Sequence, residues 1–204
     1  STRKESSAAS DVYKRQGQTS QTACLAGTYN PNTGSTSPSA CGDADAGYYV
    51  PTTGQSTQSA ADAGYYVDST LGAGQTSQTA CLAGTYNPNT GSTSSSACGD
   101  ADAGYYVPTT GQSSQSAADA GHYVDSTLGS GQTSQTACLA GTYNSNTGST
   151  SSSACGNADA GYYVDSTLGS GQSTQTACLA GTYNPNTGST SSTACGTADA
   201  GSAA

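Results

Sequence analysis

The sequence lacks most of the residues from which globular cores are built. It contains no Phe, Trp, Met or Ile, and charged residues make up 8% of its 204 residues. Ordinary domains are roughly a quarter charged and about half apolar. With so few bulky apolar side chains, a single hydrophobic core for a chain of this length cannot be assembled. We therefore expect Tyr, Val, Ala and paired Cys to supply the burial, in small units rather than in a single globular core.

Basic residues are absent from Gly17 onward, and this absence excludes two classes of partner. All four lie earlier, at Arg3, Lys4, Lys14 and Arg15. Residues 1–16 carry four cations and two anions, so without them the formal net charge moves from −9 to −11. Neutralising nucleic-acid phosphates requires Lys or Arg, and attraction to anionic membrane surfaces requires them as well. We expect no nucleic-acid partner and no direct insertion into a membrane.

Residues 1–16 differ in composition from the rest of the chain, and their last part has an identifiable coding origin. DVYKRQ, at positions 11–16, is the translation of GAT GTG TAT AAG AGA CAG, which resembles the end of a transposase adapter used in sequencing libraries. We interpret residues 1–16 as a non-native leader, joined to the chain in mid-repeat. Residues 17–204 are then a tandem repeat array, which we expect to be a fragment of a longer chain.

An internal repeat organises this array. Aligned on TAC, SAC or SAA, the chain shows three unit types, which are Cys24–Ala40, Cys41–Ala60 and Ala61–Ala80. Together they form a super-repeat that begins again at Cys81 and at Cys138, and one later unit, Cys155–Ala177, is longer than any of the three. Self-similarity at a fixed period is typical of architectures in which each unit contacts its neighbours.

Each unit is predicted to be a short β-hairpin. A strand such as GTYN or GYYV precedes a turn rich in Pro, Asn, Asp, Thr and Gly, and a polar strand such as QTSQTA follows. These are the residues that turns prefer. A single hairpin is marginal in water, so neighbouring units must complete its burial. The expected fold class is mainly β: a linear, solenoid-like array of short disulfide-stapled hairpins with little regular secondary structure.

Two columns of side chains can be distinguished by how much they vary between units. Alternation along a strand places two consecutive side chains on opposite faces. The first position of the strand is Thr, Tyr or His, whereas the second is always Tyr. We predict that the second column packs inward and that the first faces solvent or a partner. The predicted packing column is Tyr29, Tyr49, Tyr66, Tyr86, Tyr106, Tyr123, Tyr143, Tyr163 and Tyr183.

Eight cysteines without catalytic partners indicate disulfides and an oxidising compartment. Two pairing schemes fit their spacing. One joins neighbouring cysteines at a single constant spacing and uses all eight, whereas the offset scheme, which begins with Cys41–Cys81, leaves Cys24 and Cys195 unpaired. In the last super-repeat the single unit Cys155–Ala177 replaces the second and third units, so this super-repeat is shorter. We favour the constant-spacing scheme because this shortening leaves it unchanged. Its pairs are Cys24–Cys41, Cys81–Cys98, Cys138–Cys155 and Cys178–Cys195.

No residue pattern indicates catalysis. The chain shows no nucleophile–base pair, phosphate loop or nucleotide fingerprint, and its single histidine, His122, stands where other units have Tyr or Thr. We expect no enzyme, no catalytic residue and no cofactor. A zinc site is disfavoured because close Cys-x-x-Cys pairs are missing. The pairs Asp43/Asp45 and Asp100/Asp102 are weak calcium candidates, and we favour the interpretation that these aspartates are solvated or brace turns.

The pattern C-x-AGTY-x-P-x-TGSTS-x-SAC resembles the GCC-type, ephrin-receptor-like cysteine-rich repeats of long extracellular proteins. The resemblance covers residues 17–201. It implies linear arrays of small disulfide-held hairpins outside the cell, in stalks, surface proteins or receptors. This chain has fewer cysteines per unit and more Ser and Thr, and no functional residue is carried over.

These observations favour a self-associating structural subunit of an extracellular or cell-surface filament, fibre or stalk. The alternative is an adhesin or receptor ectodomain, with exposed Tyr48, Tyr65, Tyr105 and Tyr162 as a contact stripe. A disordered, mucin-like spacer is a third interpretation, against which the regular Tyr and Cys argue. Sequons for N-glycosylation are absent, whereas Ser/Thr runs such as GSTSSSA at residues 91–97 are candidate acceptors of O-linked glycans.

Overall fold

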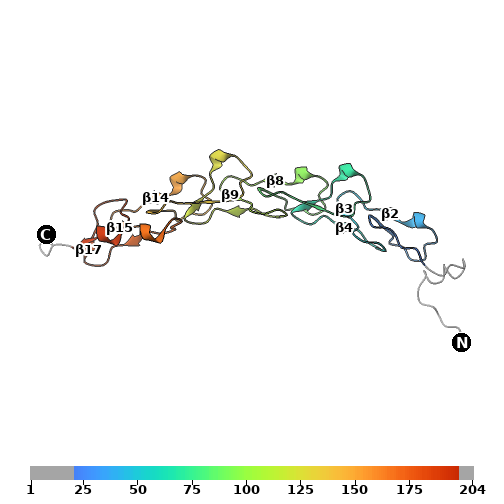
Figure 1. Ribbon diagram of the computed structural model, residues 1–204, viewed down its shortest axis with the longest axis horizontal. Coiled ribbons are helices and arrows are strands. Elements are labelled where there is room, and N and C mark those ends of the chain that lie inside the picture. The colour runs from blue at the N-terminus through green and yellow to red at the C-terminus, as the bar shows by residue number, and fades with distance from the viewer. Residues whose placement is uncertain (1–20, 198–204) are drawn as a thin grey trace, which may run out of the picture. The chain divides into compact units, whose positions relative to one another are not determined.

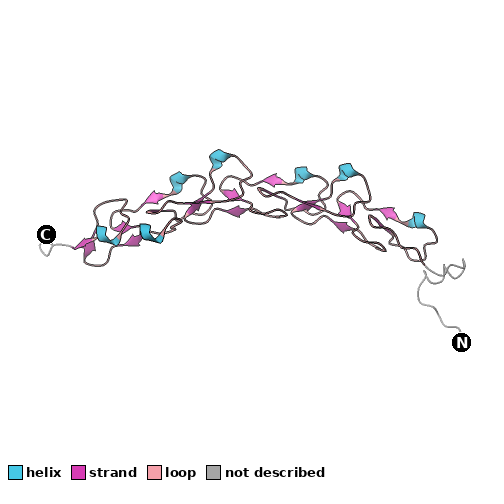
Figure 2. Ribbon diagram, viewed as in Figure 1, coloured by secondary structure: helices cyan, strands magenta, loops and turns pink. Residues whose placement is uncertain are grey.

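The computed structural model describes residues 21–197, so the leader expected at residues 1–16 lies outside the described residues. Contacts divide the described chain into two units. The first holds residues 21–82, 86–99 and 110–114, and the second holds residues 83–85, 100–109 and 115–197. Both consist of the same elements, which are two-residue strands and single-turn 3-10 helices joined by loops (Figure 2). No α-helix occurs between residues 21 and 197.

Nine two-stranded antiparallel sheets form the regular structure of the described residues. Each sheet is a hairpin of two strands that follow each other in sequence, as β3 and β4 do (Figure 1). The pairs are β1 (Thr28–Tyr29) with β2 (Gly42–Asp43), β3 (Tyr48–Tyr49) with β4 (Ser59–Ala60), β5 (Tyr65–Tyr66) with β6 (Thr79–Ala80), β7 (Thr85–Tyr86) with β8 (Gly99–Asp100), β9 (Tyr105–Tyr106) with β10 (Ser116–Ala117), β11 (His122–Tyr123) with β12 (Thr136–Ala137), β13 (Thr142–Tyr143) with β14 (Gly156–Asn157), β15 (Tyr162–Tyr163) with β16 (Thr176–Ala177), and β17 (Thr182–Tyr183) with β18 (Gly196–Thr197). The structure confirms the expected mainly β fold of repeated short hairpins.

The hairpins divide the chain into modules of three classes. Every module begins with the Ala or Cys that lies three residues before the turn glycine, and it ends with its second strand. We name the classes cysteine modules, short modules and aspartate modules. The cysteine modules are 24–43, 81–100, 138–157 and 178–197, the short modules are 44–60 and 101–117, and the aspartate modules are 61–80, 118–137 and 158–177.

This division corrects the unit boundaries expected from the sequence. Cys41 does not open a unit, because it lies within the hairpin formed by β1 and β2. The modules have only two lengths, and the long unit Cys155–Ala177 becomes the end of one cysteine module followed by a complete aspartate module. The last super-repeat, which begins at Cys138, therefore lacks one entire short module. The missing residues correspond to a whole hairpin.

Each hairpin opens with a tight turn at a glycine. In module 61–80, Tyr65 N–H donates to the Asp62 carbonyl at 3.0 Å, and Gly64 has a φ of +87°. Cys81 N–H donates to the Gly64 carbonyl at 2.8 Å and so closes the module at its far end. A positive φ favours glycine over residues with a Cβ, which explains the glycine in AGTY and AGYY.

Backbone hydrogen bonds join a module to its successor within each unit. In the first unit, Gly54 N–H donates to the Cys24 carbonyl at 2.8 Å. In the second unit, Gly148 N–H donates to the Ala118 carbonyl at 2.7 Å from the equivalent position. These bonds give each hairpin the partners that an isolated two-stranded ribbon lacks.

Modules also approach the module after next. A Cβ added to Gly64 would lie 2.2 Å from the Gly111 carbonyl oxygen, and one added to Gly121 would lie 2.2 Å from the Gly171 carbonyl oxygen. Neither position has room for a side chain. Glycine is therefore required there for close backbone approach as well as for the turn.

Small residues of each module form the core. In most modules the opening Ala or Cys is buried, and so is the residue that follows the second Tyr, which is Val in short and aspartate modules and Asn in cysteine modules. The buried amides are fully bonded, as at Asn87, whose Nδ2 donates to the Tyr65 carbonyl and to Ser92 Oγ at 2.9 Å each. The buried members are Val50, Val67, Val107, Val124, Val164, Asn87, Asn144 and Asn184.

Seven single-turn 3-10 helices interrupt the loops of the described chain. Four precede the second cysteine of a cysteine module, namely η1 (Pro38–Ala40), η3 (Ser95–Ala97), η5 (Ser152–Ala154) and η7 (Ser192–Ala194). Three lie in the aspartate modules, namely η2 (Ser69–Leu71), η4 (Ser126–Leu128) and η6 (Ser166–Leu168).

Candidate functional surface and internal crosslinks

Each cysteine forms a disulfide with its partner in the constant-spacing scheme, at a sequence separation of 17. The Cα–Cα distances of the four bonds are 5.6 to 5.7 Å, and the described residues contain no free cysteine. The pairs are Cys24–Cys41, Cys81–Cys98, Cys138–Cys155 and Cys178–Cys195. Each disulfide therefore closes a loop within its own cysteine module.

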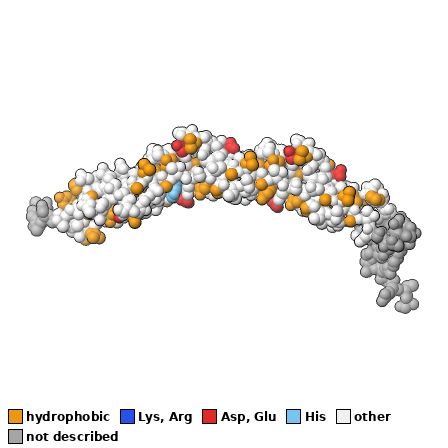
Figure 3. Space-filling view, viewed as in Figure 1, with side chains coloured by type: hydrophobic (Ala, Val, Ile, Leu, Met, Phe, Trp, Pro, Cys, Tyr) orange, Lys and Arg blue, Asp and Glu red, His pale blue; other side chains and the backbone are white. Residues whose placement is uncertain are grey.

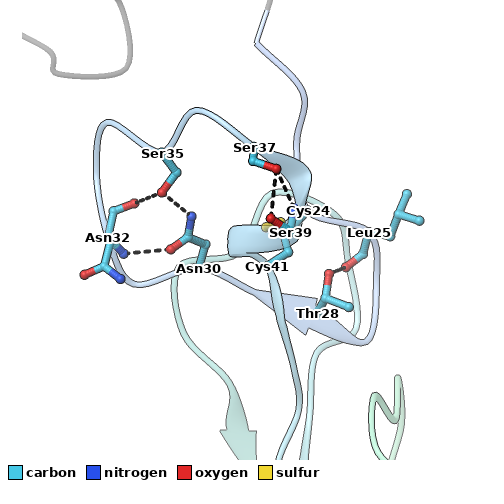
Figure 4. The surroundings of a disulfide bond; sticks show 9 residues. All are labelled: Cys24, Leu25, Thr28, Asn30, Asn32, Ser35, Ser37, Ser39 and Cys41. Carbon is cyan, nitrogen blue, oxygen red and sulfur yellow. Dashed lines mark hydrogen bonds between the residues drawn. A yellow bond between two sulfur atoms is a disulfide. The ribbon is translucent and has the colours of Figure 1, made fainter. Parts of the chain in front are cut away.

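Hydrogen bonds shape the loop inside the disulfide ring, as Figure 4 shows for the ring closed by Cys24 and Cys41. Asn30 Nδ2 donates to Ser35 Oγ at 2.7 Å. The Asn32 N–H group donates to Asn30 Oδ1 at 3.0 Å. The Asn side chain thus organises the backbone that follows it, as is common for Asn in turns.

Modules without cysteine carry a different crosslink between their two arms. In module 61–80, Asp62 N–H donates to Gln78 Oε1 at 2.7 Å, and Gln78 Nε2 donates to Asp62 Oδ2 at 2.6 Å. All five short and aspartate modules have this two-bond contact, in the pairs Asp45–Gln58, Asp62–Gln78, Asp102–Gln115, Asp119–Gln135 and Asp159–Gln175. Every described module is therefore closed either by a disulfide or by an Asp–Gln pair.

The Asp–Gln pair was not predicted above, although the sequence contains its signal. The Gln stands two residues before the end of its module, and the second Cys of a cysteine module occupies the same position. Modules that begin with Cys have Cys there, and modules with Asp as second residue have Gln there. This correlation indicates two alternative ways of closing the same hairpin.

None of the calcium candidates belongs to a cluster of three or more possible metal ligands within the described residues. Asp45 and Asp102 are engaged with glutamine side chains, and Asp100 Oδ2 accepts a hydrogen bond from Ser130 Oγ at 2.7 Å. Within residues 21–197, no group of three or more His, Cys, Asp or Glu side chains lies together. The contacts of Asp45 and Asp102 give both residues a bracing role in the hairpin.

The tyrosines of the second column, which we predict to pack inward, are not the most deeply buried side chains of their modules. Eight of its nine members are half-buried, and Tyr183 is 56% exposed. The fully buried side chain is that of the next residue, as at Val67 after Tyr66. A phenol ring is too large to be enclosed between such small hairpins, whereas Val, Asn, Ala and Cys can be.

The first column contains exposed and covered aromatic side chains. Tyr48, Tyr105 and Tyr162 are 36 to 39% exposed. Tyr65 is half-buried, because its ring lies so close to Gly111 that a Cβ there would be 2.8 Å from Tyr65 Oη. The contact stripe expected from the sequence therefore loses Tyr65.

All seven leucines of the chain are strongly exposed, which sequence analysis did not anticipate. Their exposed fractions are 70 to 80%, and Figure 3 shows apolar side chains scattered over the visible face. Four leucines follow the opening Cys of a module, where other modules have Asp, and this alternation of Leu with Asp was the available signal of exposure. The leucines are Leu25, Leu82, Leu139 and Leu179 in cysteine modules, and Leu71, Leu128 and Leu168 in aspartate modules.

Three aspartates cap the 3-10 helices of the aspartate modules. The Asp68 carboxylate accepts hydrogen bonds from Thr70 Oγ1–H at 2.6 Å and from Thr70 N–H at 2.9 Å. These two bonds hold the pKa of Asp68 below its ordinary value of 3.8, and the hydroxyl bond has the larger effect. Equivalent bonds from Thr127 and Thr167 lower the pKa values of Asp125 and Asp165.

These caps predict a specific loss of stability in acid. A carboxylate whose pKa is lower in the folded state contributes stability above the unfolded pKa, and this contribution disappears as the pH falls through the folded pKa. The triple variant Asp68→Asn, Asp125→Asn, Asp165→Asn should therefore be less stable than the wild type at about pH 7 and should approach it below about pH 3. Urea unfolding at both pH values measures the difference. An equal difference at both pH values would contradict the assignment.

Comparison of the sequence with models of protein families and with curated proteins gave no match. The described residues contain no helix of sufficient length and apolar character to cross a membrane. Four disulfides in repeated hairpins are typical of proteins that work in an oxidising, extracellular environment. The fold and its crosslinks define the class: a disulfide-rich tandem array of hairpins suited to an extracellular structural or binding module.

Proposed function

We propose that the chain is a structural component of an extracellular filament, fibre or cell-surface stalk. The main support is the reuse of one intermodule bond at all eight described junctions, irrespective of module class. In each case a glycine of the later module donates to the carbonyl of the residue that opens the earlier module. The bonds run from Gly54 to Cys24, Gly74 to Ala44, Gly91 to Ala61, Gly111 to Cys81, Gly131 to Ala101, Gly148 to Ala118, Gly171 to Cys138 and Gly188 to Ala158.

A reusable junction suits a structural role, because each added module brings the same bonds and repetition sets the length. Disulfides oppose the unfolding of individual modules, each by about 3 kcal/mol for a loop of this size in the chain-entropy model. The chain is rich in Ser and Thr, and the residues after Gly17 include no Lys or Arg. The polar and acidic side chains keep a long array hydrated.

Self-association is part of the proposal. The two-residue strands leave hairpin edges that can pair with other copies, and the exposed leucines provide apolar contacts. The net negative charge opposes close approach of two copies, so salt should favour assembly. Exposed Ser and Thr hydroxyls in the loops are candidate attachment points for O-linked glycans, in line with the proposed resemblance to extracellular GCC-type repeats.

Electron microscopy of the native material tests this function. Antibodies against the array should decorate filaments or stalks, and averaged images should show a regular axial repeat. Pre-immune serum on the same preparation is the control. Labelled material that consists only of isolated particles would contradict a filament role.

A binding module is the second candidate, and the exposed Tyr48, Tyr105 and Tyr162 favour it. Aromatic side chains supply contact area at a low entropy cost. In this case the isolated particles would capture a protein or sugar ligand, and replacing these three tyrosines with Ser would abolish capture without unfolding the chain.

A further inference from the structure

The loop enclosed by the Cys81–Cys98 disulfide makes most of the hydrogen bonds to the preceding aspartate module, 61–80. We call residues 87–93 the docking loop, together with its equivalents 144–150 and 184–190. The loop accepts three N–H groups from the preceding module, which are Gly64 to the Asn87 carbonyl at 2.7 Å, Val67 to the Ser92 carbonyl at 2.9 Å and Ser69 to the Thr93 carbonyl at 2.9 Å.

Two further bonds run in the opposite direction across this junction. Gly91 N–H donates to the Ala61 carbonyl at 2.7 Å, and Asn87 Nδ2 donates to the Tyr65 carbonyl at 2.9 Å. The Asn87 side chain is fully buried, so its amide lies where water cannot replace a lost partner. The docking loop thus both donates and accepts at a buried junction.

The other two described aspartate modules make the same contacts. Each is followed directly by a cysteine module whose docking loop receives three N–H groups. These are Gly121 to Asn144, Val124 to Ser149 and Ser126 to Thr150 in one case, and Gly161 to Asn184, Val164 to Ser189 and Ser166 to Thr190 in the other. An aspartate module itself contains no cysteine.

We infer that the disulfide of each cysteine module stabilises the preceding, cysteine-free aspartate module by holding the docking loop in its binding conformation. The loop lies entirely between the two cysteines, so the disulfide limits the conformations that it can adopt when it is not docked. A preordered loop loses less conformational entropy on docking. The disulfide of one module therefore stabilises its neighbour through the hydrogen bonds of the docking loop.

The chain contains a matched control for this inference. Residues 30–36 of the first cysteine module have the sequence NPNTGST, which is identical to residues 87–93. No complete aspartate module precedes residues 30–36 in the described part of the chain. Removing Cys24–Cys41 deletes the same kind of disulfide from the same kind of loop, without a described neighbour that depends on it.

Amide hydrogen exchange of the full chain, resolved by residue with NMR, tests the inference. In the double variant Cys81→Ser, Cys98→Ser, the amides of Gly64, Val67 and Ser69 should exchange at least about tenfold faster than in the wild type. In the control variant Cys24→Ser, Cys41→Ser, the same three amides should keep their wild-type rates. Unchanged exchange at these amides in the first variant would overturn the inference, as would equal acceleration in both.

If the first variant unfolds, so that amides exchange rapidly throughout the chain, a second variant still tests the inference. Asn87→Val retains the disulfide and introduces the residue that other module classes have at this position, but it removes the amide bond to Tyr65. Exchange at Gly64, Val67 and Ser69 should rise, while the amides of Gly84 and Ala101, which donate outside module 61–80, remain protected. If exchange at the first three amides does not change, the loop does not stabilise its neighbour and the inference is wrong. This outcome leaves the proposed structural function untouched, because that function rests on the common junction bond.

Discussion

Replacing Gly64 with Ala is expected to lower the free energy of unfolding by about 3 to 5 kcal/mol. Gly64 has a φ of +87°, a conformation in which a Cβ is strained, and the new Cβ would lie 2.2 Å from the Gly111 carbonyl oxygen. That oxygen belongs to the backbone, so it cannot rotate away as a side chain would. The contact can be relieved only by moving modules 61–80 and 101–117 apart, which stretches the junction that each makes with the intervening module 81–100. Urea unfolding of the variant and the wild type measures the loss.

Gly72→Ala is the matched control, because Gly72 lies in the same aspartate module and also has a positive φ. Its φ is +91°, but nothing lies within 4 Å of an added Cβ. This variant carries the backbone strain alone, which is about 1 to 3 kcal/mol. The difference between the two variants measures the close approach of the modules. If both lose the same amount, the contact between Gly64 and Gly111 does not limit the packing.

The repeat, the hairpins and the disulfide pairs could be predicted from the sequence because they depend on local spacing. A Gly at the third position after each opening residue sets the turn, and the cysteines of a pair, separated by 17, lie on the two arms of one hairpin. The hairpin boundaries could not be predicted in the same way. Alignment on cysteine placed Cys41 at the start of a unit, whereas pairing of Thr28 with Asp43 places it inside one.

The most deeply buried residue of a module could not be predicted from the constancy of Tyr. This constancy indicated inward packing, but a large ring can be equally constant beside the core as within it. Burial here is limited by the space between two small hairpins, and Val67 fits that space better than Tyr66 does. The Asp62–Gln78 bonds escaped prediction because they join distant positions on two arms, whose proximity follows only from the hairpin register.

The register of the modules leads to the second large prediction, which concerns deletion of residues 101–117. This deletion removes one complete short module and brings the cysteine module 81–100 directly before the aspartate module 118–137. The natural last cycle already has such a junction, between modules 138–157 and 158–177. There Gly171 N–H donates to the Cys138 carbonyl at 2.8 Å, and Asn144 N–H donates to the Gln172 carbonyl at 3.1 Å.

Scanning calorimetry of the shortened chain should show a cooperative transition with a midpoint within about 4 °C of the wild type, and an unfolding enthalpy reduced in proportion to its length. The control deletion, residues 160–176, has the same length but leaves a three-residue remnant of the aspartate module 158–177, which matches no module length. It removes Gly161, Gly171 and Val164, so it eliminates two turn or junction glycines and one core side chain. Its enthalpy should fall by clearly more than its length accounts for. Only modules that are joined by the same bonds can be removed one at a time without further loss of enthalpy. If the two deletions lose the same enthalpy, the array is not assembled from interchangeable modules.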